Sequence, residues 1–203
     1  MKENKYNNSH FFSQYSQMSR SVEGLKGAGE WHVLQKMLPD FAGKRVLDLG
    51  CGFGWHCAYA IEHGATRVTG IDISEKMLEE AQKRNSSPLI EYQCMAIEDF
   101  DFQPDSYDMV ISSLTFHYLE SFIDICRKIN HCLTLGGAFV FSVEHPIFDH
   151  FFAQKDCRTF TFCKITIYRP MDRISLLVVI PILVAVSCKY RMLYGKDKST
   201  SQS

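Results

Sequence analysis

The sequence predicts an α/β fold in which helices cover both faces of a parallel sheet. Five apolar runs of strand length alternate with helical segments between residues 45 and 143, and short connections join them. The helical segment that begins at Phe122 carries its apolar residues at helical spacing, as a helix packed on a sheet does. Such alternation favours βαβ units with right-handed crossovers. We therefore expect a Rossmann-like sheet.

The elements follow one another in a regular order. Strands are expected at residues 45–49, 66–72, 89–93, 106–113 and 138–143. Helices are expected at residues 11–18 and 30–38, directly after the first strand, at 75–84, and from 122 to about 133. Three glycines between the first two helices, Gly24, Gly27 and Gly29, indicate a flexible joint, and Gly136 with Gly137 is expected to end the last helix.

Composition excludes several classes of protein. The 203 residues include 22 Lys and Arg and 23 Asp and Glu, scattered along the chain, so we expect no basic face and no nucleic-acid partner. The eight cysteines form no C-x-x-C pair, and several lie in apolar runs, which favours buried thiols of a reducing cytoplasm over a metal site. The polar N-terminus is not typical of a signal peptide. A cytoplasmic protein without a bound metal is expected.

The chain is organised around a glycine-rich turn. The first strand ends at Leu49 and is followed by Gly50, Gly52 and Gly54, and a helical pattern starts immediately afterwards. Glycines at a strand-to-helix turn tolerate positive φ and leave no Cβ in the way, so a ligand can approach the backbone closely. This turn predicts a site for a small molecule.

The spacing of the turn argues against a dinucleotide. The G-x-G-x-x-G fingerprint needs a third glycine where Trp55 stands, and this residue is too bulky for a pyrophosphate site. The chain also contains no G-x-x-x-x-G-K-[ST] loop for a nucleoside triphosphate.

A carboxylate ends the second expected strand. Asp72 follows the glycine turn by about twenty residues, where an acid can accept both hydroxyls of a ribose. The alternative role is the N-cap of the next helix, but Ser74 already supplies a capping hydroxyl there. We favour the ribose role.

Residues 46–54, VLDLGCGFG, resemble the first motif of class I S-adenosylmethionine-dependent methyltransferases, and residues 70–74, GIDIS, resemble the second. The resemblance extends over residues 20–148 and is strongest to the type 11 domain of ubiquinone and menaquinone biosynthesis methyltransferases. It implies S-adenosylmethionine as cofactor and methyl transfer to a small-molecule acceptor. The cofactor-binding residues that we expect are Asp48, Gly50, Cys51, Gly52, Gly54, Asp72, Ile73, Met77, Ile97, Glu98, Ser112 and Arg20.

The resemblance also implies roles for the flanking segments. Residues 1–40 would form a helical cap over the cofactor, with Arg20 able to pair with the methionyl carboxylate in charge-assisted hydrogen bonds. The loop after the third strand would hold adenine. This chain has Ala96 where similar enzymes often carry an Asp, which leaves the backbone of Ile97 and the side chains of Glu98 or Asp99 as the candidate contacts.

Displacement of a methyl group from a sulfonium needs alignment more than a catalytic triad, and the sequence contains no evident triad. A base would help an acceptor with an acidic proton. Ligands of open parallel sheets bind beyond the carboxyl ends of the strands, which makes residues after the fourth and fifth strands candidates. With one residue of the cap, the candidates are His117, Glu144, His145 and Tyr15; an ordinary structural role is the alternative for His117.

The resemblance fades after Phe148, which divides the chain into the cap (1–40), a core (41–148) and an atypical tail (149–203). Three interpretations of the tail are open. Residues 159–168 and 174–186 could be the sixth and seventh strands, although Pro181 weakens the second. The thirteen residues 174–186 could be a membrane anchor, but they are shorter than a bilayer needs. We favour slightly a shifted reading frame, which would leave a damaged domain.

Three functions compete accordingly. The first is a methyltransferase for a small metabolite. The second is a protein that binds the cofactor without catalysis, because its tail cannot form the substrate wall. The third, a nicotinamide oxidoreductase, conflicts with Trp55 in the glycine turn. The sequence predicts neither the acceptor nor the oligomeric state.

Overall fold

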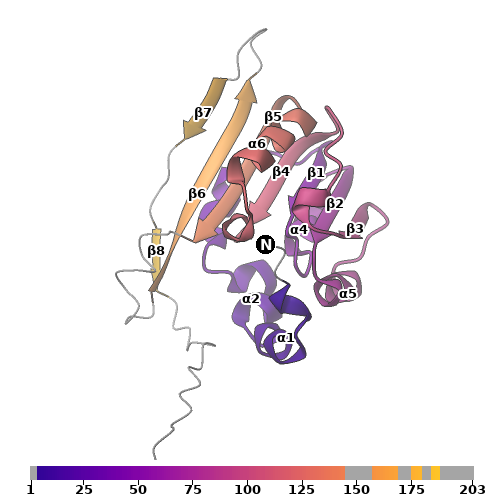
Figure 1. Ribbon diagram of the computed structural model, residues 1–203, viewed down its shortest axis with the longest axis vertical. Helices are drawn as coiled ribbons and strands as arrows, with labels where there is room; N and C mark the ends of the chain where they lie inside the picture. The colour runs from indigo at the N-terminus through magenta and orange to yellow at the C-terminus, as the bar shows by residue number, and fades with distance from the viewer. Residues whose placement is uncertain (1–3, 145–156, 169–174, 180–183, 188–203) are drawn as a thin grey trace, which may run out of the picture.

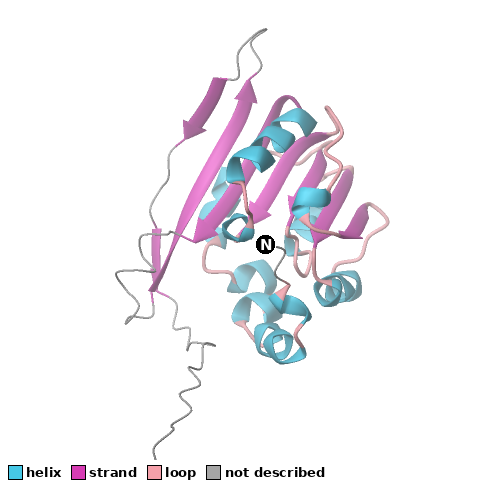
Figure 2. Cartoon of the chain, in the orientation of Figure 1, coloured by secondary structure: helices cyan, strands magenta, loops and turns pink. Residues whose placement is uncertain are grey.

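The computed structural model describes residues 4–144, 157–168, 175–179 and 184–187. A sheet lies at the centre, with helices on both faces (Figures 1 and 2). Its strands β3, β2, β1, β4 and β5 are neighbours in that order and are all parallel. The Rossmann-like α/β fold is thus confirmed. Their bounds are β1 Arg45–Leu49, β2 Arg67–Asp72, β3 Ile90–Cys94, β4 Tyr107–Ser113 and β5 Leu133–Glu144.

The strand order changes direction at β1. After β1 the chain moves to β2 and β3 on one side, and it then returns to β4 and β5 on the other. In open α/β sheets, ligands bind at such a switch point, beyond the carboxyl ends of the strands. The glycine turn that follows β1 lies at this position.

The helices separate into two layers. α6 packs on one face of the sheet, and α3, α4 and α5 pack on the other. The α-helices are α1 Ser9–Ser16, α2 Ser19–Val22, α3 Trp31–Met37, α4 Trp55–Glu62, α5 Glu75–Arg84 and α6 Phe122–Cys132. The 3-10 helices are η1 Lys5–Asn7, η2 Gly24–Gly27, η3 Ile97–Asp99 and η4 Phe116–Tyr118.

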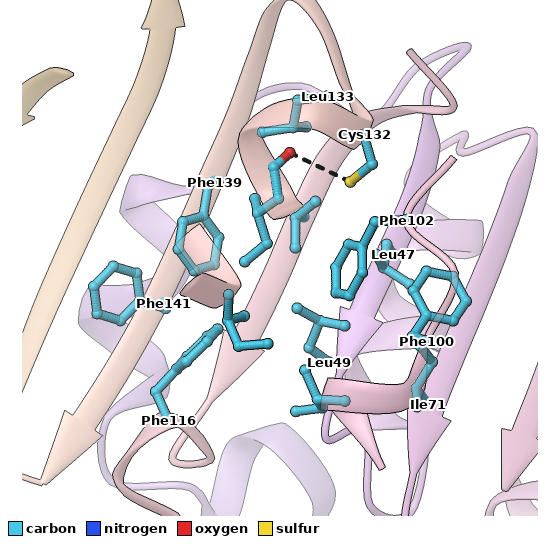
Figure 3. Packing of buried hydrophobic residues seen from close by; sticks show 14 residues of the cluster. Leu47, Leu49, Ile71, Phe100, Phe102, Phe116, Cys132, Leu133, Phe139 and Phe141 are labelled. Atoms are coloured by element: carbon cyan, nitrogen blue, oxygen red, sulfur yellow. Dashed lines mark hydrogen bonds between the residues drawn. The ribbon is translucent and has the colours of Figure 1, made fainter. Parts of the chain in front are cut away.

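Alternation along the strands builds two cores. On β1, Leu47 and Leu49 face α6, whereas Val46 faces α4. Figure 3 shows the first core, in which Phe139 and Phe141 stack with ring centroids 4.8 Å apart. Each such fully buried side chain stabilises the fold by about 1.5–3 kcal/mol. These two layers hold the carboxyl ends of β1, β2 and β4 in fixed register.

The described part of the cap, residues 4–40, begins beyond the carboxyl ends of the strands, where α1 and α2 lie (Figure 1). Polar contacts tie it to the connection between β2 and α5. The Asn4 side-chain amide donates to the Ile73 carbonyl at 2.9 Å, and the Ser74 hydroxyl donates to Asn7 Oδ1 at 2.7 Å. A further bond joins the Lys76 ammonium to the Ser9 hydroxyl, at 2.8 Å. The cap is therefore attached to the segment that follows Asp72.

Two expectations about glycines were wrong. The segment around Gly24 is not a flexible joint but the 3-10 helix η2, and a Cβ on Gly27 would lie 2.3 Å from the Ser19 carbonyl oxygen. Close packing, not freedom, requires this glycine. In the second case, α6 ends at Cys132, and β5 runs on through Gly136 and Gly137, with an irregular register opposite β4.

Further strands continue the sheet beyond β5. β6 (Cys157–Tyr168) is antiparallel to β5, β7 (Ser175–Val179) is antiparallel to β6, and β8 (Val184–Ser187) also pairs with β6. β6 and β7 take the positions of a sixth and a seventh strand; Pro181 lies outside the described residues. None of the described helices is long and apolar enough to cross a membrane. A shifted reading frame stays a hypothesis.

Candidate functional site

The glycine turn has three residues in the left-handed region. Gly50, Gly52 and Gly54 have φ values of 77°, 54° and 75°. A Cβ on Gly50 would lie 2.2 Å from Thr115 Oγ1, and one on Gly54 would lie 2.1 Å from the Tyr92 hydroxyl. A Cβ on Gly52 would meet no atom within 4 Å. Two of the glycines thus serve internal packing, whereas the third borders open space.

The amide groups of the turn are engaged inside the protein. The amides of Gly50 and Cys51 donate to the carbonyl before Asp72, at 2.8 and 2.9 Å, and that of Gly54 donates to the Cys51 carbonyl at 2.9 Å. The Gly52 amide donates to Asp72 Oδ2 at 2.9 Å. The turn therefore offers a smooth backbone surface rather than a row of free donors. This arrangement agrees with the absence of the pyrophosphate fingerprint.

Asp72 ends β2 and stands beside the turn. Its second oxygen, Oδ1, accepts from the Ser74 amide at 2.9 Å, and the side chain remains half-buried. Burial raises the pKa of this carboxyl, against the opposing effect of the amides that it accepts from. The N-cap of α5 is Ser74, whose hydroxyl accepts from the Met77 amide at 3.3 Å. Asp72 is thus not needed as the cap.

Asp48 lies on β1, just before the glycine turn in the chain, and is 1% exposed. Its Oδ2 accepts from the Cys57 thiol at 3.4 Å, whereas Oδ1 has no hydrogen-bond partner among the described residues. Burial, with a smaller effect of the nearby Asp72 charge, raises the pKa of Asp48 to about 7. A buried carboxylate oxygen without a partner costs about 1–3 kcal/mol, and such groups mark functional positions. A cationic group of a ligand, directly or through water, would complete this site.

Several expected cofactor residues are buried side chains in this structure. Ser112 is fully buried, and its hydroxyl donates to the Leu49 carbonyl at 2.7 Å. The Ser112 hydroxyl therefore supports the end of β1, and any contact of Ser112 with the cofactor would come from its backbone. Cys51, Met77 and Ile97 are 5%, 2% and 6% exposed. Any contact of Cys51 with a ligand would come from its backbone.

The loop after β3 forms the side of the site next to Asp72. The Met95 amide donates to the Asp72 carbonyl at 3.0 Å and fixes the start of the loop. Ala96 is buried, Glu98 is half-buried, and the Glu98 carbonyl accepts from the Lys128 ammonium at 2.8 Å. Ile73 is also half-buried, and its carbonyl accepts from the thiol of Cys94, the last residue of β3, at 3.8 Å.

The opposite side of the site contains an ion pair between a half-buried arginine and a buried glutamate. The Arg20 guanidinium donates to Glu30 Oε1 at 2.8 Å, and Glu30 is only 3% exposed. The Ser113 hydroxyl donates to the same oxygen at 3.3 Å. His56 lies nearby on α4, and burial lowers its pKa to about 4, so the ring is neutral at pH 7. Glu30, Ser113 and His56 were not predicted from the sequence, because their contacts form only where the segment before β1 meets β4 and α4.

Aromatic residues of the cap surround the turn. Tyr15 is half-buried, and its ring lies edge-on to Tyr6 and to Phe53 of the turn, with centroid distances of 5.2 and 5.8 Å. Burial, and next the neighbouring Tyr118 hydroxyl, raise the pKa of Tyr6. The cap therefore reaches from the glycine turn to η4.

The candidate bases occupy different positions. His117 is exposed on η4, with its ring 4.1 Å from that of Tyr118, and Tyr15 lies in the cap. Glu144 ends β5, but its side chain lies outside the described part of the structure, as does all of His145. The described candidates are His117 and Tyr15. Tyr6 links their two segments, because it contacts Tyr15 and neighbours Tyr118, the residue after His117.

Comparison with known proteins identifies relatives of this core. Residues 47–141 match the family model described as "Methyltransferase domain". A crystal structure of a putative S-adenosylmethionine-dependent methyltransferase from Listeria monocytogenes is 60% identical, with a TM-score of 0.58, and the match covers 59% of this chain and 56% of that one. An S-adenosylmethionine-dependent methyltransferase from Mesorhizobium loti is 46% identical, with a TM-score of 0.60, over 62% and 57% of the two chains.

A further relative matches about half of this chain. The ubiquinone biosynthesis O-methyltransferase of Neisseria meningitidis serogroup C is 35% identical over 107 residues, which are 51% of this chain and 45% of that protein. The chain thus spans about half the length of these three relatives. The family match begins at Leu47 and ends at Phe141, so it includes the turn, Asp72 and η4 but neither the cap nor the tail.

Proposed function

We propose that the chain transfers the methyl group of S-adenosylmethionine to a small-molecule acceptor, because its residues 47–141 match a methyltransferase domain and its core resembles S-adenosylmethionine-dependent methyltransferases. One observation carries the proposal. Two buried or half-buried carboxylates, Asp48 and Asp72, flank a turn whose middle glycine, Gly52, borders open space. A ligand with ribose hydroxyls and an ammonium group matches these acceptors.

Different residues would bind different parts of the cofactor. Asp72 would accept the ribose hydroxyls, and the loop from Ile97 to Glu98 would hold adenine on the side of β3. Asp48 would receive the methionyl ammonium, directly or through water, and Arg20 would pair with the methionyl carboxylate. Ile73 and Met77 would frame the adenosine from the start of α5.

S-adenosylmethionine supplies a methyl group activated by the sulfonium charge. The protein's own contribution is to hold the acceptor in line with that group and to keep water out, and alignment of this kind can supply about 7–11 kcal/mol of the barrier. The relatives named O-methyltransferases support an acceptor oxygen. The aromatic side chains of the cap and η4 would close the pocket around the acceptor.

Calorimetric titration tests the cofactor. We expect S-adenosylmethionine and S-adenosylhomocysteine to bind and NAD not to bind. Asp72→Ala should abolish binding of both, because it removes the ribose acceptor and releases the Gly52 amide. The matched control is Asp40→Ala, since Asp40 also accepts from a loop amide, that of Ala42 at 3.1 Å, but lies before β1. A folded native chain that binds neither adenosyl ligand, or binds NAD instead, would refute the proposal.

His117 is proposed as the general base. If it accepts the proton of the acceptor, His117→Ala should lower turnover by about 10²–10⁴-fold and leave the affinity for S-adenosylhomocysteine unchanged. Turnover is to be measured with an acceptor found by screening, beside Tyr15→Phe and the exposed His131→Ala as control. Unchanged turnover in His117→Ala would transfer the role to Tyr15, Glu144 or His145.

A second function is favoured by one observation. The family match ends at Phe141, before β6, so it does not include the segment that would complete the substrate wall. A protein that binds the cofactor without catalysis would bind S-adenosylmethionine in the same titration but would methylate no acceptor in the screen.

A further inference from the structure

We propose that Glu30 is a positioning residue, which aims the Arg20 guanidinium at the methionyl carboxylate of the cofactor; this inference rests on the function proposed above. Glu30 is the N-cap residue of α3 and is buried, but its side chain makes no capping hydrogen bond, and the described residues contain no metal-binding cluster. A buried carboxylate is stable only when it is paired and hydrogen-bonded. Arg20, at 2.8 Å, supplies that pairing.

The polar group around Glu30 connects the cap to the sheet. Glu30 Oε1 accepts from Arg20 of α2 and from the Ser113 hydroxyl at the end of β4. The Ser113 hydroxyl is in turn 3.1 Å from that of Ser142 on β5. The position of the guanidinium is therefore set by the carboxyl ends of two strands and not by the cap alone.

The strand order places this group beside the methionyl half of the site. Asp72 ends β2, so the ribose lies over β2 and adenine lies toward β3. The sheet continues from β2 through β1 to β4, and the other half of the cofactor must extend in that direction. Ser113, and with it Glu30 and Arg20, lies at the end of β4.

The charges around the pair favour a fixed geometry. His56 is buried and neutral, so it does not compete with Arg20 for the Glu30 carboxylate. The side chain of an arginine on a four-residue helix would otherwise keep much of its rotamer freedom. A planar guanidinium that one carboxylate already orients loses less freedom when it binds a second carboxylate.

Two ligands that differ only in the carboxylate test this proposal. S-adenosylmethionine and decarboxylated S-adenosylmethionine share the adenosine, the sulfonium and the ammonium. We expect Glu30→Gln to weaken S-adenosylmethionine about tenfold, because a misdirected guanidinium loses part of a charge-assisted hydrogen bond, and to leave the decarboxylated ligand unchanged. The matched control is Glu23→Gln, which removes an exposed glutamate of the same segment and should change neither affinity.

Ser113→Ala provides a second variant that keeps the ion pair. It removes one of the two hydrogen bonds to Glu30 and should weaken S-adenosylmethionine in the same selective way, by about two- to fivefold. Equal weakening of both ligands in these variants would indicate a structural role for Glu30 and would overturn the inference, as would unchanged affinities. A native chain that binds neither ligand would instead refute the proposed function, and the inference with it.

Discussion

Asp48→Asn is expected to make the protein without cofactor more stable at pH 8, by about 2 kcal/mol, while weakening its affinity for S-adenosylmethionine. The pKa of Asp48 in the fold is about 7, against 3.8 ordinarily. Ionisation of this group in the fold thus costs about 4 kcal/mol at pH 8. An asparagine avoids that cost, but it buries an amide without an acceptor, which destabilises the fold by about 1–3 kcal/mol.

The pH dependence gives the sign of the effect. Between pH 4 and pH 7 the folded chain holds a proton on Asp48 that the unfolded chain has lost, so the contribution of this group to stability falls as the pH rises and is constant above about pH 7. Urea unfolding from pH 5 to pH 9 should therefore show native and variant curves that diverge up to pH 7. The affinity for S-adenosylmethionine, measured at pH 8, should fall about 10- to 100-fold, because the methionyl ammonium loses a charged partner.

Asp108→Asn is the control of opposite sign. Burial raises the pKa of Asp108, but the Arg45 guanidinium and amide outweigh burial, so the pKa lies below its ordinary value. This carboxylate stabilises the fold above its unfolded pKa, and its loss should destabilise the protein at pH 8. An Asp48→Asn variant that is less stable than the native chain at pH 8 would mean that the Asp48 charge has a partner in the fold.

Gly52→Ala is expected to abolish most cofactor binding at a small cost in stability. The added methyl group points into open space in the protein, where the ligand would otherwise lie, and overpacking of this kind costs about 1–3 kcal/mol. We therefore expect a loss of about 10- to 100-fold in affinity for S-adenosylhomocysteine by calorimetry. The free energy of unfolding should fall only by the cost of an alanine at positive φ, about 1–2 kcal/mol.

Gly43 offers a matched control for this experiment. It also has a positive φ, 73°, and a Cβ there would meet nothing within 4 Å, but it lies in the turn before β1. Gly43→Ala should lose as much stability as Gly52→Ala and keep full affinity. Gly54→Ala, whose Cβ would collide with Tyr92, should instead unfold the protein more readily. Equal affinities for the Gly52 and Gly43 variants would remove the turn from the binding site.

Local patterns were sufficient to predict the centre of the fold. The strand, turn and helix around Gly50 follow from apolar alternation and glycine spacing, and the capping hydroxyl of Ser74 is where its residue type indicated. The boundaries of β5 were missed, because a strand that passes through Gly136 and Gly137 depends on its partner β4 and not on propensity. The close packing at Gly27 was also missed, because it depends on the contact with the Ser19 backbone and not on the propensity of glycine.

The site was predictable only where its residues are close in sequence to a strand end. Asp72 is the last residue of β2, where the sequence placed it, and its role at the ribose stays a prediction. Glu30 was not predicted, since its partners Arg20 and Ser113 are ten and eighty-three residues away along the chain. The motif that contains Ser112 was evident in the sequence, but the burial of its side chain was not, because that burial depends on how β4 packs beside β1.

The bonds from Asn4 and Asn7 to the segment after Asp72 have a kinetic effect. These bonds and the contact of Tyr6 with Tyr118 hold the start of the cap, and the ion pair of Arg20 with Glu30 holds a later part of it. If the cofactor lies beneath the cap, as proposed, we expect its release to require that these contacts open. The residence time of the demethylated product is then set by the opening of the cap, so product release, rather than methyl transfer, would limit the steady-state rate.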